Sequence, residues 1–174
     1  AGHFYPIMTG MCTAFASDID NLSRDLQEIK PQYLPGVPRV FEKIYAFAML
    51  TINEYSPSKK KVFYWAVDVG KQFDTLFRAG KNVPIGLKIK LQLARALVFK
   101  KVLVKTGGEI LCFISGGASL PQELARFYGA IGLTILEGYG LTETSPVTNM
   151  NDPRDVQYGL VGPVIPGTEL KIAS

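Results

Sequence analysis

Residues 137–148 of this chain read Glu-Gly-Tyr-Gly-Leu-Thr-Glu-Thr-Ser-Pro-Val-Thr. The stretch combines flexible glycines, one aromatic ring, threonine hydroxyls and two carboxylates, and an apolar run at 133–136 precedes it. Such a run predicts a buried strand that ends in a loop. A loop that offers a stacking surface, hydroxyls and a carboxylate at the carboxyl end of a strand is typical of a nucleotide site in an α/β sheet.

A second loop, made of small residues, lies one helix earlier. The sequence Ser115-Gly-Gly-Ala-Ser119 follows residues 110–114, which are apolar at every position, as in a central strand covered on both faces. Ser119 and Gln122 fit a capping box for a helix over 120–131. Because crossovers between parallel strands are right-handed, we expect both loops at the same edge of the sheet.

Strand and helix patterns alternate along the rest of the chain, which predicts an α/β fold with parallel strands and helices in layers. Apolar residues predict further strands at 11–16 and 32–37, and residues 169–172 predict a strand that needs a partner the sequence does not supply. The helical spacing of apolar residues, with breakers at the ends, predicts four more helices. The first lies at 19–29, with Ser17 or Asp18 as its cap, and the second runs from Pro38 to a breaking run at 56–61. The third lies at 62–79, and the fourth lies at 86–105 and stops at Gly107-Gly108.

Composition fits one globular domain and excludes several classes of protein. Of 174 residues, 47% are hydrophobic and 20% are charged, and no apolar run approaches the ~20 residues that span a bilayer. Cys12 and Cys112 stand among apolar neighbours, so we expect buried free thiols in a reducing cytosol. One histidine and no paired-cysteine motif argue against a zinc-type site.

The region between Thr75 and Gly108 holds eight basic residues and no acidic one. A basic helical segment at 78–105 is a candidate for contact with a membrane surface or a nucleic acid. At 100° per residue, however, Lys88 and Arg95 fall on one face, while Lys90, Lys101 and Lys105 fall roughly opposite. A solvated surface is therefore the favoured interpretation, peripheral membrane contact stays open, and no nucleic-acid partner is expected.

Residue chemistry alone makes the two loops a plausible nucleotide site. The small residues at 116–118 let a flat ligand approach the backbone, and Tyr139 can stack on it. Thr142 can donate to a phosphate oxygen, and Glu143 can bind a hard cation such as Mg²⁺. Each signal also has a purely structural explanation: a turn with a packed ring, a loop hydroxyl, a solvated carboxylate. A glycine-rich loop without the P-loop lysine does not indicate a phosphate site by itself.

Four stretches in the same order resemble one enzyme family. Residues 137–145 resemble the adenine- and phosphate-binding motif of the adenylate-forming (AMP-binding) superfamily, and 115–120 resemble the loop that precedes it. Residues 33–45 (Tyr-Leu-Pro-Gly-Val-Pro-Arg-Val-Phe-Glu-Lys-Ile-Tyr) and 161–172 (Val-Gly-Pro-Val-Ile-Pro-Gly-Thr-Glu-Leu-Lys-Ile) narrow the resemblance to long-chain fatty acid–CoA ligases. The segment around Asp18-Ile-Asp-Asn also fits that group.

The resemblance implies a two-step reaction. A fatty acid carboxylate attacks the α-phosphate of ATP to give an acyl-adenylate and pyrophosphate, and the thiol of coenzyme A then displaces AMP. ATP/AMP, Mg²⁺ and coenzyme A are the implied cofactors and co-substrates, and the fatty acid is the implied partner. Charge develops on a pentavalent phosphorus, so positioning and electrostatics dominate and no protein nucleophile is needed.

The same resemblance implies a role for each residue of the two loops, with Thr142 and Glu143 as the catalytic pair. Tyr139, flanked by Gly138 and Gly140, would stack on the adenine ring. Glu137 would lie near the exocyclic amine of adenine. Gly117, Ala118 and Ser119 line the other side of the base, Gly116 lies beside the acyl group, Thr142 holds the α-phosphate, and Glu143 is the Mg²⁺ ligand.

Several motifs of the family do not occur in the 174 residues: the phosphate loop, the ribose-binding Thr-Gly-Asp, and the C-terminal domain with its catalytic lysine. We therefore expect residues 1–174 to be a central fragment of the N-terminal domain, inactive alone. Its expected parts are strand–helix units at 11–55, a basic helical region at 56–108, adenine-site units at 109–150, and a turn-rich segment leading to a strand at 151–174. His3 lies too close to the Asp18 helix to be the family's motif histidine, and we expect no catalytic role for it.

Two alternatives to a cytoplasmic long-chain fatty acid–CoA ligase remain. The first is another adenylate-forming enzyme, such as an aryl-CoA ligase or a peptide-synthetase adenylation domain, although the Pro-Arg-Val-Phe-Glu-Lys run favours the fatty acid group. The second is a module that binds nucleotide or a membrane surface without catalysis. Acyl chain length and oligomeric state cannot be predicted from this sequence.

Overall fold

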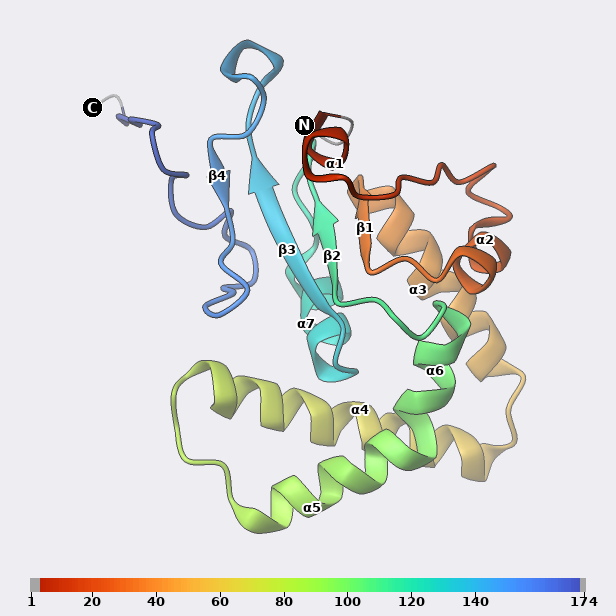
Figure 1. Ribbon diagram of the computed structural model, residues 1–174. Helices are drawn as coiled ribbons and strands as arrows, with labels where there is room; N and C mark the ends of the chain where they lie inside the picture. The colour runs from red at the N-terminus through yellow and green to blue at the C-terminus, as the bar shows by residue number, and fades with distance from the viewer. Residues whose placement is uncertain (1–3, 173–174) are drawn as a thin grey trace.

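A four-stranded sheet forms the centre of the computed structural model, which describes residues 4–172 (Figure 1). Strands β1, β2 and β3 are parallel neighbours, and β4 pairs antiparallel with β3 at the edge. The strands are β1 (Tyr33–Gly36), β2 (Cys112–Ser115), β3 (Thr134–Tyr139) and β4 (Asn149–Met150). The predicted α/β fold with parallel strands is thus confirmed, and β4 is an addition to it.

Seven α-helices, one π-helical turn and one 3₁₀ turn complete the described part of the chain. The α-helices are α1 (Phe4–Thr9), α2 (Leu22–Ile29), α3 (Pro38–Asn53), α4 (Pro57–Arg78), α5 (Ile85–Ala94), α6 (Lys100–Lys105) and α7 (Gln122–Ala130). The π-helical turn η1 (Arg95–Phe99) joins α5 to α6, and the 3₁₀ turn η2 (Thr142–Thr144) lies after β3. In Figure 1, α4 and α5 form an antiparallel pair below the sheet, and α7 lies behind it.

The core lies between the sheet and helices α3, α4 and α7. The Phe113 ring of β2 lies 5.2 Å from those of Phe41 in α3 and Tyr128 in α7. The Tyr128 hydroxyl donates a 2.7 Å hydrogen bond to the Phe41 carbonyl oxygen, so its polar atom has a partner in the core. Burial raises the pKa of Tyr128, which keeps the phenol neutral and donating. These three aromatic residues fix two helices to one face of β2.

Helices α4 and α7 approach each other closely at Gly70. A Cβ atom on Gly70 would lie 2.1 Å from the carbonyl oxygen of Ala130, closer than any side chain can come. Glycine is therefore required there to bring the two helix backbones together. Leu136 and Val156 are buried on the opposite face of the sheet, where the segment after β4 covers it.

The predicted strand at 11–16 is wrong, and residues 169–172, whose predicted strand needs a partner that this sequence does not supply, do not pair in the described part of the chain. Both segments lack regular structure and are exposed, and neither pairs with another strand in the described part of the chain. A segment becomes a strand only when its backbone groups pair with those of a neighbouring strand, and neither segment makes such a ladder in the described part of the chain. Because 11–16 lies on the surface, Cys12 is exposed rather than buried as expected, whereas Cys112 is buried. His3 lies outside the described residues.

Three predicted helix starts are also wrong. Helix α4 begins at Pro57, because proline favours the first helical position, so the run 56–61 starts a helix instead of breaking one. Helix α2 begins after Asn21, and Ser17 donates its backbone N–H and its hydroxyl to Asp25 instead of capping. The predicted capping box of Ser119 and Gln122 does not form, since α7 begins after Pro121.

The predicted helix over 86–105 is one continuous helical segment that contains the η1 turn. The predicted strands at 32–37, 110–114 and 133–136 correspond to β1, β2 and β3, with ends shifted by one to three residues. Strand β3 runs on to Tyr139, so the first residues of the predicted loop belong to the strand.

Candidate functional site

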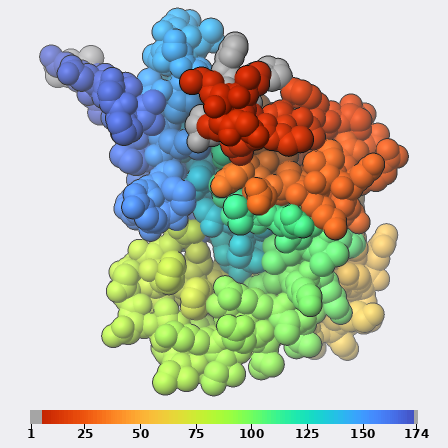
Figure 2. Space-filling model, in the orientation of Figure 1, coloured from red at the N-terminus to blue at the C-terminus, as the bar shows by residue number. Residues whose placement is uncertain are grey.

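The carboxyl ends of the three parallel strands meet at one edge of the sheet. Gly36 of β1 is in register with Ser115 of β2, and Ser115 is in register with Glu137 of β3. The loop at 116–119 and the segment 137–144 therefore emerge side by side, as the sequence predicted. Figure 2 shows residues 140–147, the site loop, as light blue atoms that project from the body of the protein.

The loop after β2 leaves its backbone open to a ligand. Gly117 adopts a φ of +83°, which side chains larger than hydrogen rarely tolerate. Gly117, Ala118 and Ser119 are exposed, and Gly116 is half-buried. Ser115, just before them, is buried, and its Oγ has no hydrogen-bond partner in the described part of the chain. Sequence reasoning counted Ser115 as loop and missed this unpaired hydroxyl at the strand end.

Glu137 is buried in β3 rather than displayed in a loop. Its exposed fraction is 6%, and its Oε1 atom accepts a 3.1 Å hydrogen bond from the backbone N–H of Gly159. The carboxylate thus fixes the turn that follows β4 to the end of β3. Tyr139, two residues later, keeps 47% of its surface exposed and makes no ring contact within residues 4–172. Its face is therefore available for stacking.

The site loop is shaped by bonds within itself. The Leu141 N–H donates to Thr144 Oγ1 at 2.9 Å, and the Thr144 N–H donates to the Leu141 carbonyl oxygen at 3.0 Å. A Cβ on Gly140 would lie 1.6 Å from the Pro146 carbonyl oxygen, so any side chain at this position would force the loop to move. Thr144 is used by the loop itself, whereas the side chains of Thr142 and Glu143 face solvent at its tip.

Glu143 is a lone carboxylate. Within the described residues, no group of three or more histidine, cysteine, aspartate or glutamate side chains could hold a metal ion. Mg²⁺ in nucleotide sites is typically bound by one or two carboxylates plus substrate phosphates, so a single exposed Glu143 fits that donor set. Exposed Thr142 beside it supplies a hydroxyl of the kind that phosphate oxygens accept.

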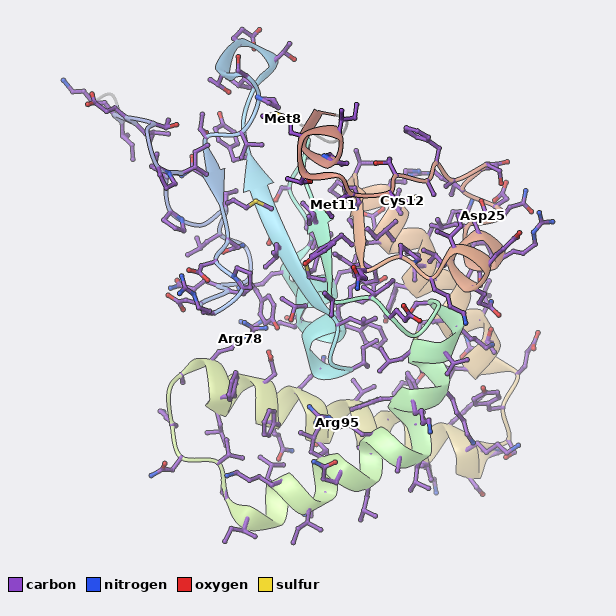
Figure 3. All side chains as sticks on the ribbon, viewed as in Figure 1. Met8, Met11, Cys12, Asp25, Arg78 and Arg95 are labelled. Carbon is purple, nitrogen blue, oxygen red and sulfur yellow. The ribbon has the colours of Figure 1, made fainter. Side chains whose placement is uncertain are left out.

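A half-buried polar cluster, made of Asp74, Arg78 and Tyr158, joins the end of α4 to the segment after β4. The Tyr158 hydroxyl donates to Asp74 Oδ2 at 2.8 Å, and Arg78 Nε donates to Asp74 Oδ1 at 2.9 Å. The Arg78 guanidinium also lies 4.5 Å from the Tyr158 ring centre and donates to the Val156 carbonyl oxygen. Burial, followed by the negative charge of Asp74, raises the pKa of Tyr158. Figure 3 shows Arg78 near the end of α4.

This cluster connects the helices to the site. It lines a cavity of about 780 Å³ between α4, α7 and residues 155–158. The Gln122 side chain donates to the Tyr158 carbonyl oxygen, and the next residue, Gly159, holds Glu137. The sequence assigned Arg78 to the solvated basic segment, whereas it is half-buried and paired. The spacing of Asp74 and Arg78 on one helix was the available signal, but their partner lies 80 residues or more away.

No helix within residues 4–172 is both long and apolar enough to cross a membrane. The other basic residues of 78–105 (Lys81, Lys88, Lys90, Arg95, Lys100, Lys101 and Lys105) are exposed.

Relatives of known name resemble the chain over most of its length. It is 38% identical over 160 residues to the long-chain-fatty-acid–CoA ligase FadD15 of Mycobacterium bovis, covering 91% of this chain and 26% of that protein. It is 35% identical over 164 residues to the human long-chain-fatty-acid–CoA ligase ACSBG2, covering 90% of this chain and 24% of that protein. The chain therefore spans about a quarter of the length of these relatives.

Solved structures share the fold. The anthranilate CoA ligase AuaEII in complex with anthranoyl-AMP superimposes with a TM-score of 0.54 at 16% identity, over 94% of this chain and 22% of that one. A benzoate CoA ligase from Burkholderia xenovorans gives a TM-score of 0.50 at 23% identity, over 93% of this chain and 23% of that one. A family model described as AMP-binding enzyme matches residues 1–174. The chain belongs to the AMP-binding enzyme family.

Proposed function

We propose that this chain contributes the adenine-side wall of a long-chain fatty acid–CoA ligase, which activates a fatty acid with ATP and transfers it to coenzyme A. The observation that carries the proposal is the register of β2 and β3, which brings the open 116–119 backbone beside the exposed Tyr139 ring. The two relatives named long-chain-fatty-acid–CoA ligase support the fatty acid as the substrate class.

The residues would divide the work of binding. Tyr139, held between Gly138 and Gly140, stacks on the adenine ring, and residues 117–119 line the other side of the base. Gly116 lies toward the acyl group, and the Thr142 hydroxyl donates to the α-phosphate. Mg²⁺, when bound at Glu143, would neutralise phosphate charge. We place the adenine amine near Glu137, although its Oε1 already accepts the Gly159 N–H, so only its remaining acceptor capacity is free.

Two further parts of the proposal concern the location of the protein in the cell and its contact with membranes. We propose a cytoplasmic enzyme that contacts membranes peripherally through residues 78–105. The exposed lysines of this segment and Arg95 support that contact, whereas Arg78 is paired with Asp74 and takes no part in it.

Binding of a nonhydrolysable palmitoyl-adenylate analogue tests the function. We expect Tyr139→Ala to weaken binding about tenfold, since loss of stacking on one base costs about 1–3 kcal/mol. Tyr139→Phe keeps the ring and should retain affinity within about twofold. Tyr64→Ala, which removes an exposed tyrosine on α4, is the matched control.

The same titration separates fatty acid from aryl ligases. We expect the palmitoyl analogue to bind more tightly than a benzoyl-adenylate analogue. Tighter binding of the benzoyl compound would assign an aryl ligase instead, and equal loss with Tyr64→Ala and Tyr139→Ala would contradict the proposed adenine wall.

A further inference from the structure

A second cavity lies away from the strand ends. It has a volume of about 580 Å³ and is lined by α2, α3, the start of α4, η1 and α6. Figure 1 shows these elements gathered on the right-hand side of the molecule, away from the site loop that projects at the top. None of residues 115–119 or 137–144 lines it, so it is separate from the candidate site. Its volume lies within the range of about 300–1,000 Å³ typical of small-molecule pockets.

The walls of this cavity are hydrocarbon. Leu22, Leu26, Ile52, Phe63 and Val98 are buried around it. At its mouth, large apolar side chains stay in contact with solvent: Phe47 at 42% exposure, Val62 at 42% and Leu97 at 55%. Apolar surface gathered around a hollow marks a binding site more often than scattered surface residues do.

The charge at this cavity has one sign. Lys43, Lys59, Lys101 and Lys105 line it, and no aspartate or glutamate does. Lys43 is paired with Asp20, but the other three have no carboxylate partner within residues 4–172. Lysine stems pack along apolar surface while their ammonium groups stay in water. An apolar interior with uncompensated cations around it is complementary to an anion that carries a long hydrocarbon chain.

The π-helical turn η1 points to the same place. It interrupts the continuous helix from Ile85 to Lys105, and two of its residues, Leu97 and Val98, line the cavity. A π turn inside an α-helix is rare and is frequently found at functional sites. Here it lies one turn before Lys101 and so affects which side chains of α6 face the cavity.

We propose that this cavity binds a monomeric long-chain carboxylate at a site separate from the adenylate site. The hydrocarbon chain lies between α2, α3 and α6, and the carboxylate lies among Lys59, Lys101 and Lys105. The site goes beyond the proposed function because it holds a fatty acid away from the strand ends, where the adenylate would form. It also gives the exposed basic residues of α6 a specific partner.

Calorimetric titration of the 174-residue chain with palmitate, below the concentration at which it aggregates, tests this site. We expect the double variant Lys101→Glu/Lys105→Glu to raise the palmitate Kd about tenfold or more. The matched control Lys88→Glu/Lys90→Glu makes the same charge change on exposed residues of α5 that do not line the cavity. It should change the Kd by less than about twofold.

Leu97→Glu is a second variant that acts on the apolar mouth, and its exposed position limits its effect on folding. We expect a similar loss of palmitate affinity, and hexadecanol, which lacks the carboxylate, should not respond to the Lys101→Glu/Lys105→Glu change. An unchanged palmitate Kd in both cavity variants overturns the proposal. So does the absence of palmitate binding, including the case in which phosphatidylserine vesicles bind and monomeric palmitate does not.

This outcome is independent of the adenylate site. Tyr139→Ala should leave the lysine-sensitive palmitate site unchanged while it weakens binding of the palmitoyl-adenylate analogue. Either result can therefore fail without the other.

Discussion

The site loop (residues 140–147) and the helical support (α4 with α7) both depend on a glycine whose Cβ would collide with a backbone carbonyl. In the support, Gly70 faces the Ala130 oxygen, and in the loop, Gly140 faces the Pro146 oxygen. The surroundings differ. Gly70 lies in the core, where neighbours cannot move, whereas the loop is largely exposed and bonded mainly to itself.

The difference separates stability from binding. A collision in a close-packed interior must be absorbed by the whole fold. A collision in an exposed loop is relieved by moving the loop, which leaves the fold intact but displaces the residues at its tip. The size of the collision alone therefore does not tell whether a glycine is needed for stability or for binding. The burial of the residues around the glycine distinguishes the two cases.

Gly70→Ala is the strongest test of this comparison. The added methyl group forces α4 and α7 apart, and we expect a loss of about 3 kcal/mol in the free energy of unfolding, measured by urea denaturation. Gly86→Ala is the matched control, because Gly86 lies in α5 with nothing within 4 Å of an added Cβ. It should stabilise by about 0.5 kcal/mol. Equal effects of the two changes would contradict the assigned close approach.

Gly140→Ala tests the other half. We expect the loop to open at Pro146, so that the palmitoyl-adenylate analogue binds about tenfold more weakly while the free energy of unfolding changes by less than about 1 kcal/mol. Gly138→Ala is the comparison within the same segment, since its added Cβ makes an ordinary 3.5 Å contact with the Asn149 oxygen. If Gly140→Ala lowers stability as much as Gly70→Ala, the loop belongs to the rigid part of the protein.

Tyr158→Phe addresses the connection between the two regions. It removes the hydroxyl that donates to Asp74 and accepts from Arg78, and we expect a loss of about 1.5 kcal/mol in the free energy of unfolding. Tyr64→Phe, on the exposed face of α4, should change it by less than about 0.5 kcal/mol. Because Tyr158 precedes the Gly159 that holds Glu137, a modest loss of analogue affinity should accompany the first change only.

The sequence predicted the three parallel strands and the meeting of the two loops, because apolar runs and small-residue turns are local signals. It did not predict the partial burial of Arg78, which depends on Tyr158 and Val156 far along the chain. Residues 11–16 failed for the same reason: their composition suits a strand, but pairing requires an edge that the pattern does not show. The sequence placed Glu137 in a loop, whereas it belongs to β3. The strand extends past Glu137 because Gly138 and Tyr139 pair with β4, and the local apolar pattern does not show this pairing.

A third segment, the surface stretch that leads into α2, lies in neither of the two regions, and the pH dependence of its stability extends the comparison. The Ser17 backbone N–H, and then its hydroxyl, donate to Asp25 and lower the pKa of that carboxyl. A lowered pKa in the folded state means that this contribution is present above the ordinary aspartate pKa of about 4 and is lost as the pH falls through the folded value.

We therefore expect Ser17→Ala to lower Tm slightly at about pH 7 and to have less effect at about pH 3, where Asp25 is increasingly protonated. Asp25→Asn is the control, because it removes the titrating group, and its own Tm should lack this component of the acid dependence. If Ser17→Ala lowers Tm equally at both pH values, the bond from Ser17 does not depend on the charge of Asp25. The segment 17–25 would then be held by apolar packing, here of Leu22 and Leu26, just as apolar packing holds the helical support.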